Sequence, residues 1–385
     1  MSALEVVFWV AAALLVYTVA GYPILLRAIV AAGGGRRRPP ADDAAARSTA
    51  GEPPTVSLIV AAHDEESVIG RSIAGALALD YPRRRLELIV ASDGSTDRTV
   101  EVAREAGADL VLDLPRGGKV AALNAAVERA SGEVLAFADA NSSWRPDALR
   151  RLVSALAEPG VGYVCGQLRL LSSAGDNQEG LYWRYEMKVR ELESRLAGIT
   201  AGNGAINAVR RDAYVFLKPE RGQDINLPFR LVKHGWLPVY EPAAVAEEPM
   251  ATTIGDELGR KRRMMTGAWA TLLGGGMLSP RGYRPLYALE IASHRLLRYA
   301  SPLLHAVVLA ANLALLGEGP VYAVTLALQA AVVVAAALAP VIPLAPLRIA
   351  RYYLAVTAAS ALGLLDYLRG GVPTTWDKAA GTREA

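Results

Sequence analysis

The stretch Gly118–Asn141 brings together residue types that can bind a metal ion and a phosphate. Lys119 follows a glycine pair, a helical alanine-rich segment comes next, and the apolar run 134–138 ends in Asp139-Ala140-Asn141. An acidic residue where an apolar strand meets a loop lies at the carboxyl edge of a sheet, where open α/β folds bind ligands. Two oxygen-bearing side chains one residue apart suit Mg²⁺ or Mn²⁺, with phosphates as further ligands. The stretch therefore indicates a metal site for a phosphate-bearing ligand, although it also fits a plain strand and capped turn.

Short apolar runs alternate with helical segments between residues 56 and 162. The runs are too short for helices and are separated by segments with helical spacing, which predicts a mostly parallel sheet with right-handed crossovers. Three acidic residues follow the ends of such runs: Glu65, Asp93 and Asp139. Because the carboxyl ends of parallel strands meet at one edge, we expect these three side chains to converge.

Four motifs in this region resemble those of a family-two glycosyltransferase, which is inverting, membrane-bound and related to hyaluronan, chitin and cellulose synthases. VSLIVAAHDEE at 56–66 resembles the family's opening strand and its P-A-Y-N-E-E turn, with Ala61 and His63 replacing Pro and Tyr. The other three motifs resemble D-D-G-S-T-D, G-K-x-x-A-L-N and D-x-D, and they read SDGSTD at 92–97, GKVAALN at 118–124 and DAN at 139–141.

The resemblance implies an α/β fold of the GT-A, Rossmann-like type and a nucleotide-diphosphate sugar donor, with a UDP-sugar expected. It implies that Asp93 holds the nucleotide base and that Asp139 and Asn141 hold Mg²⁺ or Mn²⁺. Asn141 offers an oxygen but carries one negative charge fewer than the family's second Asp. The donor-binding residues expected from the resemblance are Ala61, His63, Glu65, Asp93, Lys119, Asp139 and Arg263.

QDINLPFR at 223–230 resembles the family's E-D-x-x-L-x-x-R-L segment, with Gln223 in place of Glu. The resemblance implies that Asp224 is the general base. One carboxylate is enough for this reaction, because it removes the acceptor hydroxyl proton as the oxygen attacks the anomeric carbon opposite the leaving phosphate. Taken without the resemblance, Asp224 fits a helix N-cap.

Two further segments bear on the acceptor. TAGNGAINAVRR at 200–211 resembles the family's acceptor-side segment, which implies acceptor contacts from Gly202, Asn203 and Gly204, although glycine-rich turns before strands are common. GRKRRMMTG at 259–267 keeps the Arg of the Q-x-x-R-W motif as Arg263 but lacks its Gln and Trp, which disfavours processive synthesis. The basic residues there suit a diphosphate or anionic lipid.

The two ends of the chain are apolar and predict membrane segments. Apolar residues make up 52% of the sequence, and the net charge of +3 without a basic stripe argues against nucleic acid as a partner. The only cysteine, Cys165, excludes an intramolecular disulfide and fits a cytosol-facing protein. Arginines after the first apolar segment, and none before it, place the amino terminus outside and the following part in the cytoplasm.

We therefore predict the following organisation: an N-terminal transmembrane helix at 1–30, a linker at 31–55, a cytoplasmic GT-A domain at 56–282, an interfacial amphipathic helix at 283–298, a C-terminal transmembrane region at 299–370 and a tail at 371–385. In the C-terminal region, the uncharged runs 299–317 and 319–347 are long enough to span, and the run 352–365 is marginal. We expect the tail in the cytoplasm.

These expectations describe an integral membrane enzyme: a metal-dependent, inverting hexosyl- or N-acetylhexosaminyltransferase. It would use a lipid-linked or saccharide acceptor at the cytoplasmic face, in polysaccharide or cell-envelope synthesis. Two alternatives remain open. One is a processive synthase that also translocates its polymer, and the other is a membrane protein that binds a nucleotide sugar without catalysis.

Overall fold

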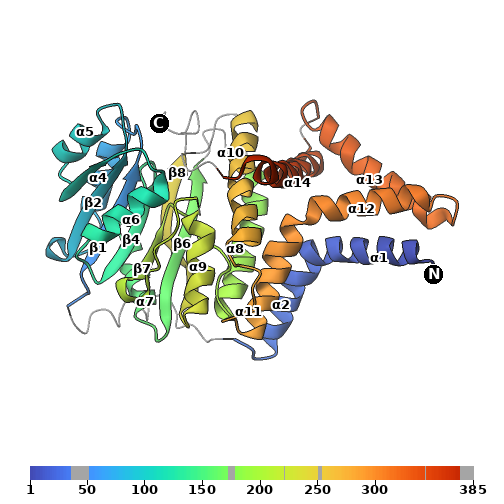
Figure 1. The fold of residues 1–385 in the computed structure, drawn as a ribbon, viewed down its shortest axis with the longest axis horizontal. Helices are drawn as coiled ribbons and strands as arrows, with labels where there is room; N and C mark the ends of the chain where they lie inside the picture. Colours follow the sequence, from blue (N-terminus) through green and yellow to red (C-terminus); the bar gives the residue numbers. More distant parts are fainter. Residues whose placement is uncertain (36–51, 172–177, 221, 250–253, 343, 373–385) are drawn as a thin grey trace.

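The computed structural model describes residues 1–35, 52–171, 178–220, 222–249, 254–342 and 344–372. A mixed sheet with its covering helices lies at one end of the long axis, and apolar helices from both ends of the chain lie at the other end (Figure 1). Most of the predicted linker and tail, including Trp376 and Arg383, lies outside the described residues.

One eight-stranded sheet has the order β3-β2-β1-β4-β7-β6-β8-β5. β1 lies between β2 and β4 with parallel pairing, β7 pairs antiparallel with both β4 and β6, and β6 and β8 are parallel. The predicted parallel half is therefore present, and the second half makes the sheet mixed. The strands are β1 Val56–Ala62, β2 Leu86–Asp93, β3 Leu110–Leu114, β4 Val134–Asp139, β5 Ser143–Trp144, β6 Val161–Leu171, β7 Asn207–Arg210 and β8 Leu237–Pro249.

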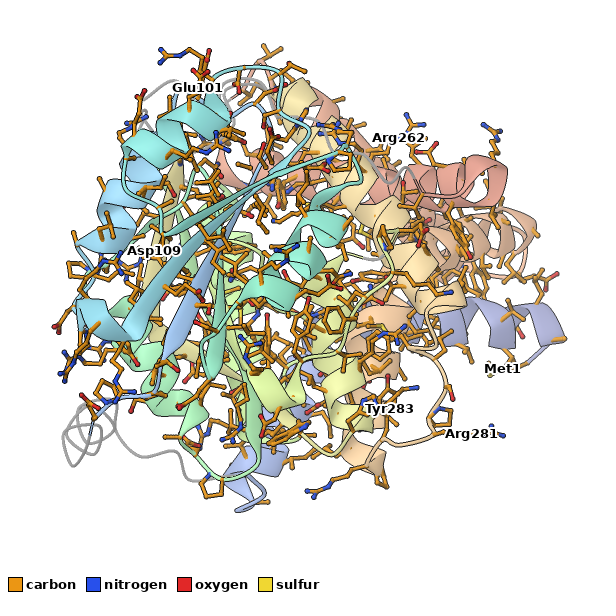
Figure 2. The ribbon with its side chains drawn as sticks, turned by 60° about the vertical axis from the view of Figure 1, so that its left-hand side comes forward. Met1, Glu101, Asp109, Arg262, Arg281 and Tyr283 are labelled. Carbon is orange, nitrogen blue, oxygen red and sulfur yellow. The ribbon has the colours of Figure 1, made fainter. Side chains whose placement is uncertain are left out.

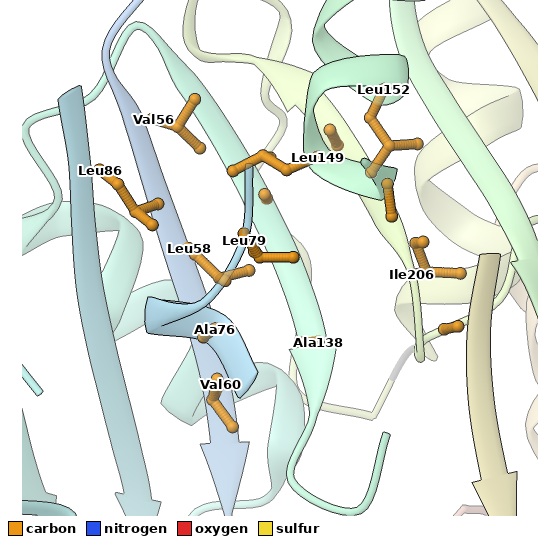
Figure 3. Close-up of a cluster of buried hydrophobic side chains, with 14 of the residues drawn as sticks. Val56, Leu58, Val60, Ala76, Leu79, Leu86, Ala138, Leu149, Leu152 and Ile206 are labelled. Carbon is orange, nitrogen blue, oxygen red and sulfur yellow. The ribbon is translucent and has the colours of Figure 1, made fainter. Parts of the chain in front are cut away.

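Each face of the sheet packs on its own hydrophobic core. Alternate residues of β1 belong to different cores, because successive strand side chains point to opposite faces: Leu58 and Val60 to one, Ile59 and Ala61 to the other. Figure 3 shows the first core, in which Leu58 lies beside Leu79 and Val60 beside Ala76. The helices of the domain are α4 Ile69–Leu77, α5 Thr99–Glu105, α6 Lys119–Arg129, α7 Ala148–Leu156, α8 Gln178–Arg195, α9 Gln223–Lys233 and α10 Ile254–Trp269.

The N-terminal segment is helical from Ala3 to Ala31, as α1 Ala3–Val16, the π-turn η1 Tyr17–Gly21 and α2 Tyr22–Ala31. Its 29 residues and high hydropathy make it long and apolar enough to cross a membrane, as predicted. α13, Pro320–Leu338, meets the same criteria. Two candidate spans are therefore present among the described residues.

The remaining C-terminal segments differ from the sequence expectation. The run 299–317, predicted to span, forms only the 14-residue helix α12, Ser301–Ala314, which is too short to span alone. It follows α11, Pro285–Glu290, and the π-helix η6, Ile291–Leu297, with a bend of 62° between the two halves, so only the bent pair together reaches spanning length.

The marginal run 352–365 is part of a longer helix, α14, Ala345–Gly370. α14 packs against α10 of the sheet domain. Arg262 on α10, labelled in Figure 2, donates two hydrogen bonds of 2.6 Å to the Asp366 carboxylate on α14. The C-terminal region is thereby attached directly to the domain.

The predicted amphipathic segment 283–298 is helical, but most of its polar side chains face protein. Glu290 is fully buried, and His294 and Arg295 are 3% and 8% exposed. The polar face that was expected at the membrane interface therefore contacts other parts of this chain. Periodicity identifies such a face but does not reveal what covers it.

Candidate active site

Three charged side chains meet beside Gly204, at the edge of the sheet where β4 ends. A Cβ built on Gly204 would lie 2.9 Å from Lys119 Nζ, 3.2 Å from Asp224 Oδ1 and 3.4 Å from Asp139 Oδ2. Four residues far apart in the sequence thus surround one small space. The sequence predicted roles for all four, and the structure brings them together.

Asp139 and Lys119 come from consecutive elements. Asp139 ends β4, and Lys119 is the first residue of α6, where its ammonium pairs with Asp139 Oδ1. Burial alone would lower the pKa of Lys119, but the carboxylates of Asp139 and Asp224 outweigh it and raise that pKa above its ordinary value. Lys119 is therefore a fixed positive charge at neutral pH.

Asp224 lies in the first turn of α9, after the cap residue Gly222. The alternative reading of Asp224 as the N-cap is therefore wrong by two positions. Burial is the main cause that raises the pKa of the Asp224 carboxyl, Lys119 lowers it, and Asp139 raises it further. A carboxylate with a raised pKa is a stronger proton acceptor than an ordinary aspartate, which suits a general base.

Asp93, at the end of β2, is buried and supports the turn that presents Lys119. Its carboxylate accepts hydrogen bonds from the backbone N–H groups of Gly117 at 2.6 Å and Gly118 at 2.9 Å. Gly118 has a φ of 91°, a conformation that favours glycine, and it begins α6. The expected contact between Asp93 and a nucleotide base remains a prediction.

The loop after β1 is held against the loop after β2. His63 Nδ1 lies 2.8 Å from the Asp93 carbonyl oxygen, and the Glu65 N–H donates to the Thr99 hydroxyl at 2.7 Å. Ala61 pairs in register with Asp139 across the β1–β4 ladder. Ala61, His63 and Glu65 thus lie at the same sheet edge as Asp93 and Asp139, and Glu65 is buried.

The loop 199–204 closes the other side of the site. The Gly202 N–H donates to the Asp224 carbonyl oxygen at 2.8 Å. Asn203 is buried, donates to the Gly166 carbonyl at 2.9 Å and accepts from the Ile206 N–H at 2.9 Å. The Asn203 side chain therefore shapes the loop, and its expected acceptor contact remains a prediction.

The three atoms nearest the Gly204 Cβ include none from the predicted residues Asn141 and Arg263. Asn141 lines a pocket of about 320 Å³ on the α4 side of the sheet, together with Ala138 and Ala140. Arg263 is exposed on α10. Their expected contacts with metal and diphosphate remain predictions.

Sequence reasoning missed two charged neighbours of the site. Arg190 on α8 is 9% exposed and donates to the Gly202 carbonyl at 3.3 Å, and its charge lowers the pKa of Asp224. Glu248 on β8 adds to the carboxylates that raise the pKa of Lys119. Both lie outside the recognisable motifs. α8 carries many charged residues, and its sequence alone does not distinguish Arg190 from the others.

The protein fits a divalent cation only in part. Among the described residues no group of three or more His, Cys, Asp or Glu side chains is arranged to hold a metal. Asp139 and Asp224 each present a half-buried carboxylate at the meeting point. Such a donor set suits a cation whose other ligands are phosphate oxygens and water, as is common for Mg²⁺.

The fold and the charged edge of the sheet define a GT-A-like domain. A mannosyltransferase from Pyrobaculum calidifontis, solved with GDP-Man and Mn²⁺, is similar over 94% of this chain and 99% of its own, with a TM-score of 0.68 and 22% identity. Residues 57–216 match the family Glycosyl transferase family 2. This match confirms the resemblance on which the sequence motifs were interpreted.

Two curated relatives match this chain over about half of its length. A beta-monoglucosyldiacylglycerol synthase from Synechocystis is 30% identical over 222 residues, which are 51% of this chain and 44% of that protein. An N-acetylglucosaminyltransferase from Rhizobium leguminosarum is 26% identical over 228 residues, 54% of each chain. The chain therefore spans about half the length of these relatives.

Proposed function

We propose that the protein is a membrane-bound inverting glycosyltransferase that moves a sugar from a nucleotide-diphosphate donor to a lipid-linked or saccharide acceptor. The observation that carries the proposal is the meeting of Lys119, Asp139 and Asp224 around Gly204. An ammonium, a half-buried carboxylate and a carboxylate with a raised pKa lie side by side there, which supports the binding and reaction of one substrate at this point.

The proposed roles follow from charge. Lys119 pairs with the diphosphate, where negative charge grows as the sugar leaves. Asp224 accepts the proton of the acceptor hydroxyl as the hydroxyl oxygen attacks the anomeric carbon on the face opposite the leaving diphosphate. This attack inverts the configuration. Arg263 is a further candidate for the diphosphate, and His63 and Glu65 shape the donor side.

A divalent cation belongs to the proposed donor complex. Asp139 would hold it, with Asn141 as a second candidate, and the cation would neutralise charge on the leaving diphosphate. The similar mannosyltransferase was solved with Mn²⁺, which supports this part of the proposal. We predict a UDP-sugar from the motifs, and GDP-mannose in the same neighbour makes GDP-sugars the second class to test.

Two observations support an acceptor at the membrane. Two candidate spans flank the domain in sequence, and one curated relative is named as a glucosyldiacylglycerol synthase. We infer that residues 56–282 form a cytoplasmic catalytic domain and that the acceptor is presented at that face of the membrane.

The first test is the substitution Asp224→Asn. Purified protein is incubated with UDP- and GDP-sugars, Mn²⁺ and a lipid extract, and released nucleoside diphosphate is measured. We expect Asp224→Asn to lower turnover by about 100-fold or more, because it removes the proton acceptor, while donor binding measured by calorimetry changes little. Asp212→Asn, a change at an exposed aspartate beside Arg210, is the matched control. Normal turnover of Asp224→Asn would remove Asp224 from the mechanism, and donor binding without turnover in the wild type would favour the non-catalytic alternative.

A further inference from the structure

A buried polar cluster lies between the proposed active site and the apolar helices. It joins α8, the loop 199–204 and η6 through Glu193, Thr200 and Arg295. Glu193 and Thr200 have no exposed surface, and Arg295 is 8% exposed. Buried charges are costly unless they are paired and hydrogen-bonded, so a cluster of this kind holds its members in defined positions.

Thr200 is at the centre of this cluster. Its hydroxyl donates to the Glu193 carboxylate at 3.2 Å and accepts from Arg295 Nε at 2.8 Å. Its backbone N–H donates to the same carboxylate at 3.3 Å. One side chain therefore links a helix of the sheet domain to the segment that precedes α12.

The Glu193 carboxylate extends the connection to both ends of the chain. It accepts a hydrogen bond from the Tyr22 hydroxyl at 2.7 Å, and His294 Nδ1 lies 2.6 Å from it. Tyr22 begins α2 in the N-terminal apolar helix, and His294 is in η6. The position of Thr200 therefore depends on both apolar regions.

The other end of the loop reaches the proposed site within four residues. Gly202 donates to the Asp224 carbonyl at 2.8 Å and accepts from Arg190 at 3.3 Å. Gly204 then lies against the Lys119 ammonium. The loop between Thr200 and Gly204 is short, so we expect a displacement of Thr200 to shift the residues beside Asp224.

We propose that Thr200 is a positioning residue that couples the two apolar helical regions to the geometry of the proposed active site. It touches no reacting atom, and it acts by fixing Gly202 and Gly204 against Asp224 and Lys119. The expected effect on turnover rests on the proposed function, whereas the expected effect on the order of the loop does not. A misplacement of about 1 Å at a reacting group lowers rates by up to about 100-fold.

Three variants separate positioning from general stability. Thr200→Val keeps the shape of the side chain and removes the hydroxyl, whereas Thr200→Ser keeps the hydroxyl. Tyr22→Phe removes a hydroxyl that donates to the Glu193 carboxylate, and it replaces Thr200→Val as the test variant if Thr200→Val does not fold. Glu191→Gln, a change at an exposed residue of α8 paired with Lys188, is the matched control.

The variants are compared with the wild type in lipid nanodiscs by two measurements. Hydrogen–deuterium exchange of the segment 199–206 reports loop order without any substrate, and turnover reports catalysis. We expect Thr200→Val to raise exchange in this segment and lower kcat by about 10-fold or more with donor affinity nearly unchanged, and Thr200→Ser to restore both. Tyr22→Phe is expected to shift both readouts in the same direction by a smaller amount.

The proposal is overturned if the segment 199–206 exchanges in Thr200→Val as it does in the wild type. It is also overturned if Glu191→Gln changes exchange and turnover as much as Thr200→Val does. Raised exchange with an unchanged kcat in an active enzyme also overturns it, because the active-site geometry would then not depend on the order of the loop. An inactive wild type refutes the proposed function instead, and the exchange measurement still decides whether Thr200 orders the loop.

Discussion

Gly204 matters because it has no side chain. The three charged atoms within 3.4 Å of its missing Cβ leave no room for a methyl group unless one of them moves. The nearest is the Lys119 ammonium, at the far end of a flexible side chain, so the protein can relax there without unfolding. Gly204 has no positive φ, and alanine can adopt its backbone conformation.

We therefore predict that Gly204→Ala folds with a near-normal melting temperature and loses about 10-fold or more in turnover, since the methyl group displaces Lys119 from Asp139. Circular dichroism and nucleoside diphosphate release measure the two quantities. Gly202→Ala is the contrasting variant, because its Cβ would overlap the hydroxyl of the buried Tyr163, and it should lower the melting temperature. Full activity in Gly204→Ala would show that this space is not used by substrate or by Lys119.

The raised pKa of Asp224 predicts how turnover depends on pH. The base works only when deprotonated, so kcat/KM, which reports the free enzyme, should fall as the pH falls through this pKa. The inflection should lie above the ordinary aspartate value of 3.8, because burial and Asp139 both raise the pKa. Lys119→Met should move the inflection higher still, since Lys119 lowers the pKa of Asp224. A pH profile of kcat/KM at limiting donor, which reports the free enzyme, tests both statements, and a shift to lower pH in Lys119→Met would contradict them.

At the scale of helices, Gly363 of α14 packs directly against α10. A Cβ on Gly363 would lie 2.7 Å from Met265 Cβ and 2.8 Å from the Thr266 backbone nitrogen. Neither atom is the end of a flexible chain, so an added methyl group must separate the two helices.

We predict that Gly363→Ala lowers the stability of the protein by about 1–3 kcal/mol through overpacking. Gly370→Ala lies near the end of the same helix with nothing within 4 Å of its Cβ and should have little effect. Thermal unfolding in the same detergent compares the two variants. Equal melting temperatures would mean that the α10–α14 contact contributes little to stability.

The strands and helices of the sheet domain are largely predictable, because short apolar runs bounded by polar turns leave few other assignments. The opening strand expected at the start of the segment 56–66 is present as β1, Val56–Ala62. The same pattern identifies Asp93 and Asp139 as strand ends, which brings them to one edge. The antiparallel β7 was only loosely indicated, since a strand of four residues carries too little alternation to read.

The contacts of the loop 199–204 and of η6 were not predictable from the sequence. Which residue of a glycine-rich turn faces Lys119 depends on how β7 returns beside β4, and no local pattern records that pairing. Likewise, the polar residues of η6 repeat with helical spacing whether they face water, lipid headgroups or Glu193. Tertiary contacts decide between these cases, and they involve residues about 100 positions away.

At the scale of the whole molecule, the number of crossings determines the side on which α14 ends. If the N-terminal helix, the bent pair 285–314 and α13 all cross, the end of α14 lies on the same side as the sheet domain. If the bent pair is re-entrant, the end of α14 lies on the opposite side. Arg348, Arg351 and Arg369 in α14 favour the cytoplasm under the positive-inside bias, so we predict three crossings.

Single-cysteine labelling can test this topology, because the chain without an introduced cysteine should react little with the label. Cys165 is the only cysteine, it is buried, and burial raises the pKa of its thiol, so it should react slowly with maleimides. Cysteines are introduced one at a time as Ala3→Cys, Ala32→Cys and Gly370→Cys, and intact cells are treated with a membrane-impermeant maleimide. We expect labelling of Ala3→Cys only, and labelling of the other two after lysis. Labelling of Gly370→Cys in intact cells would mean an even number of crossings and a re-entrant bent pair, because the two ends of the chain would then share the outer side.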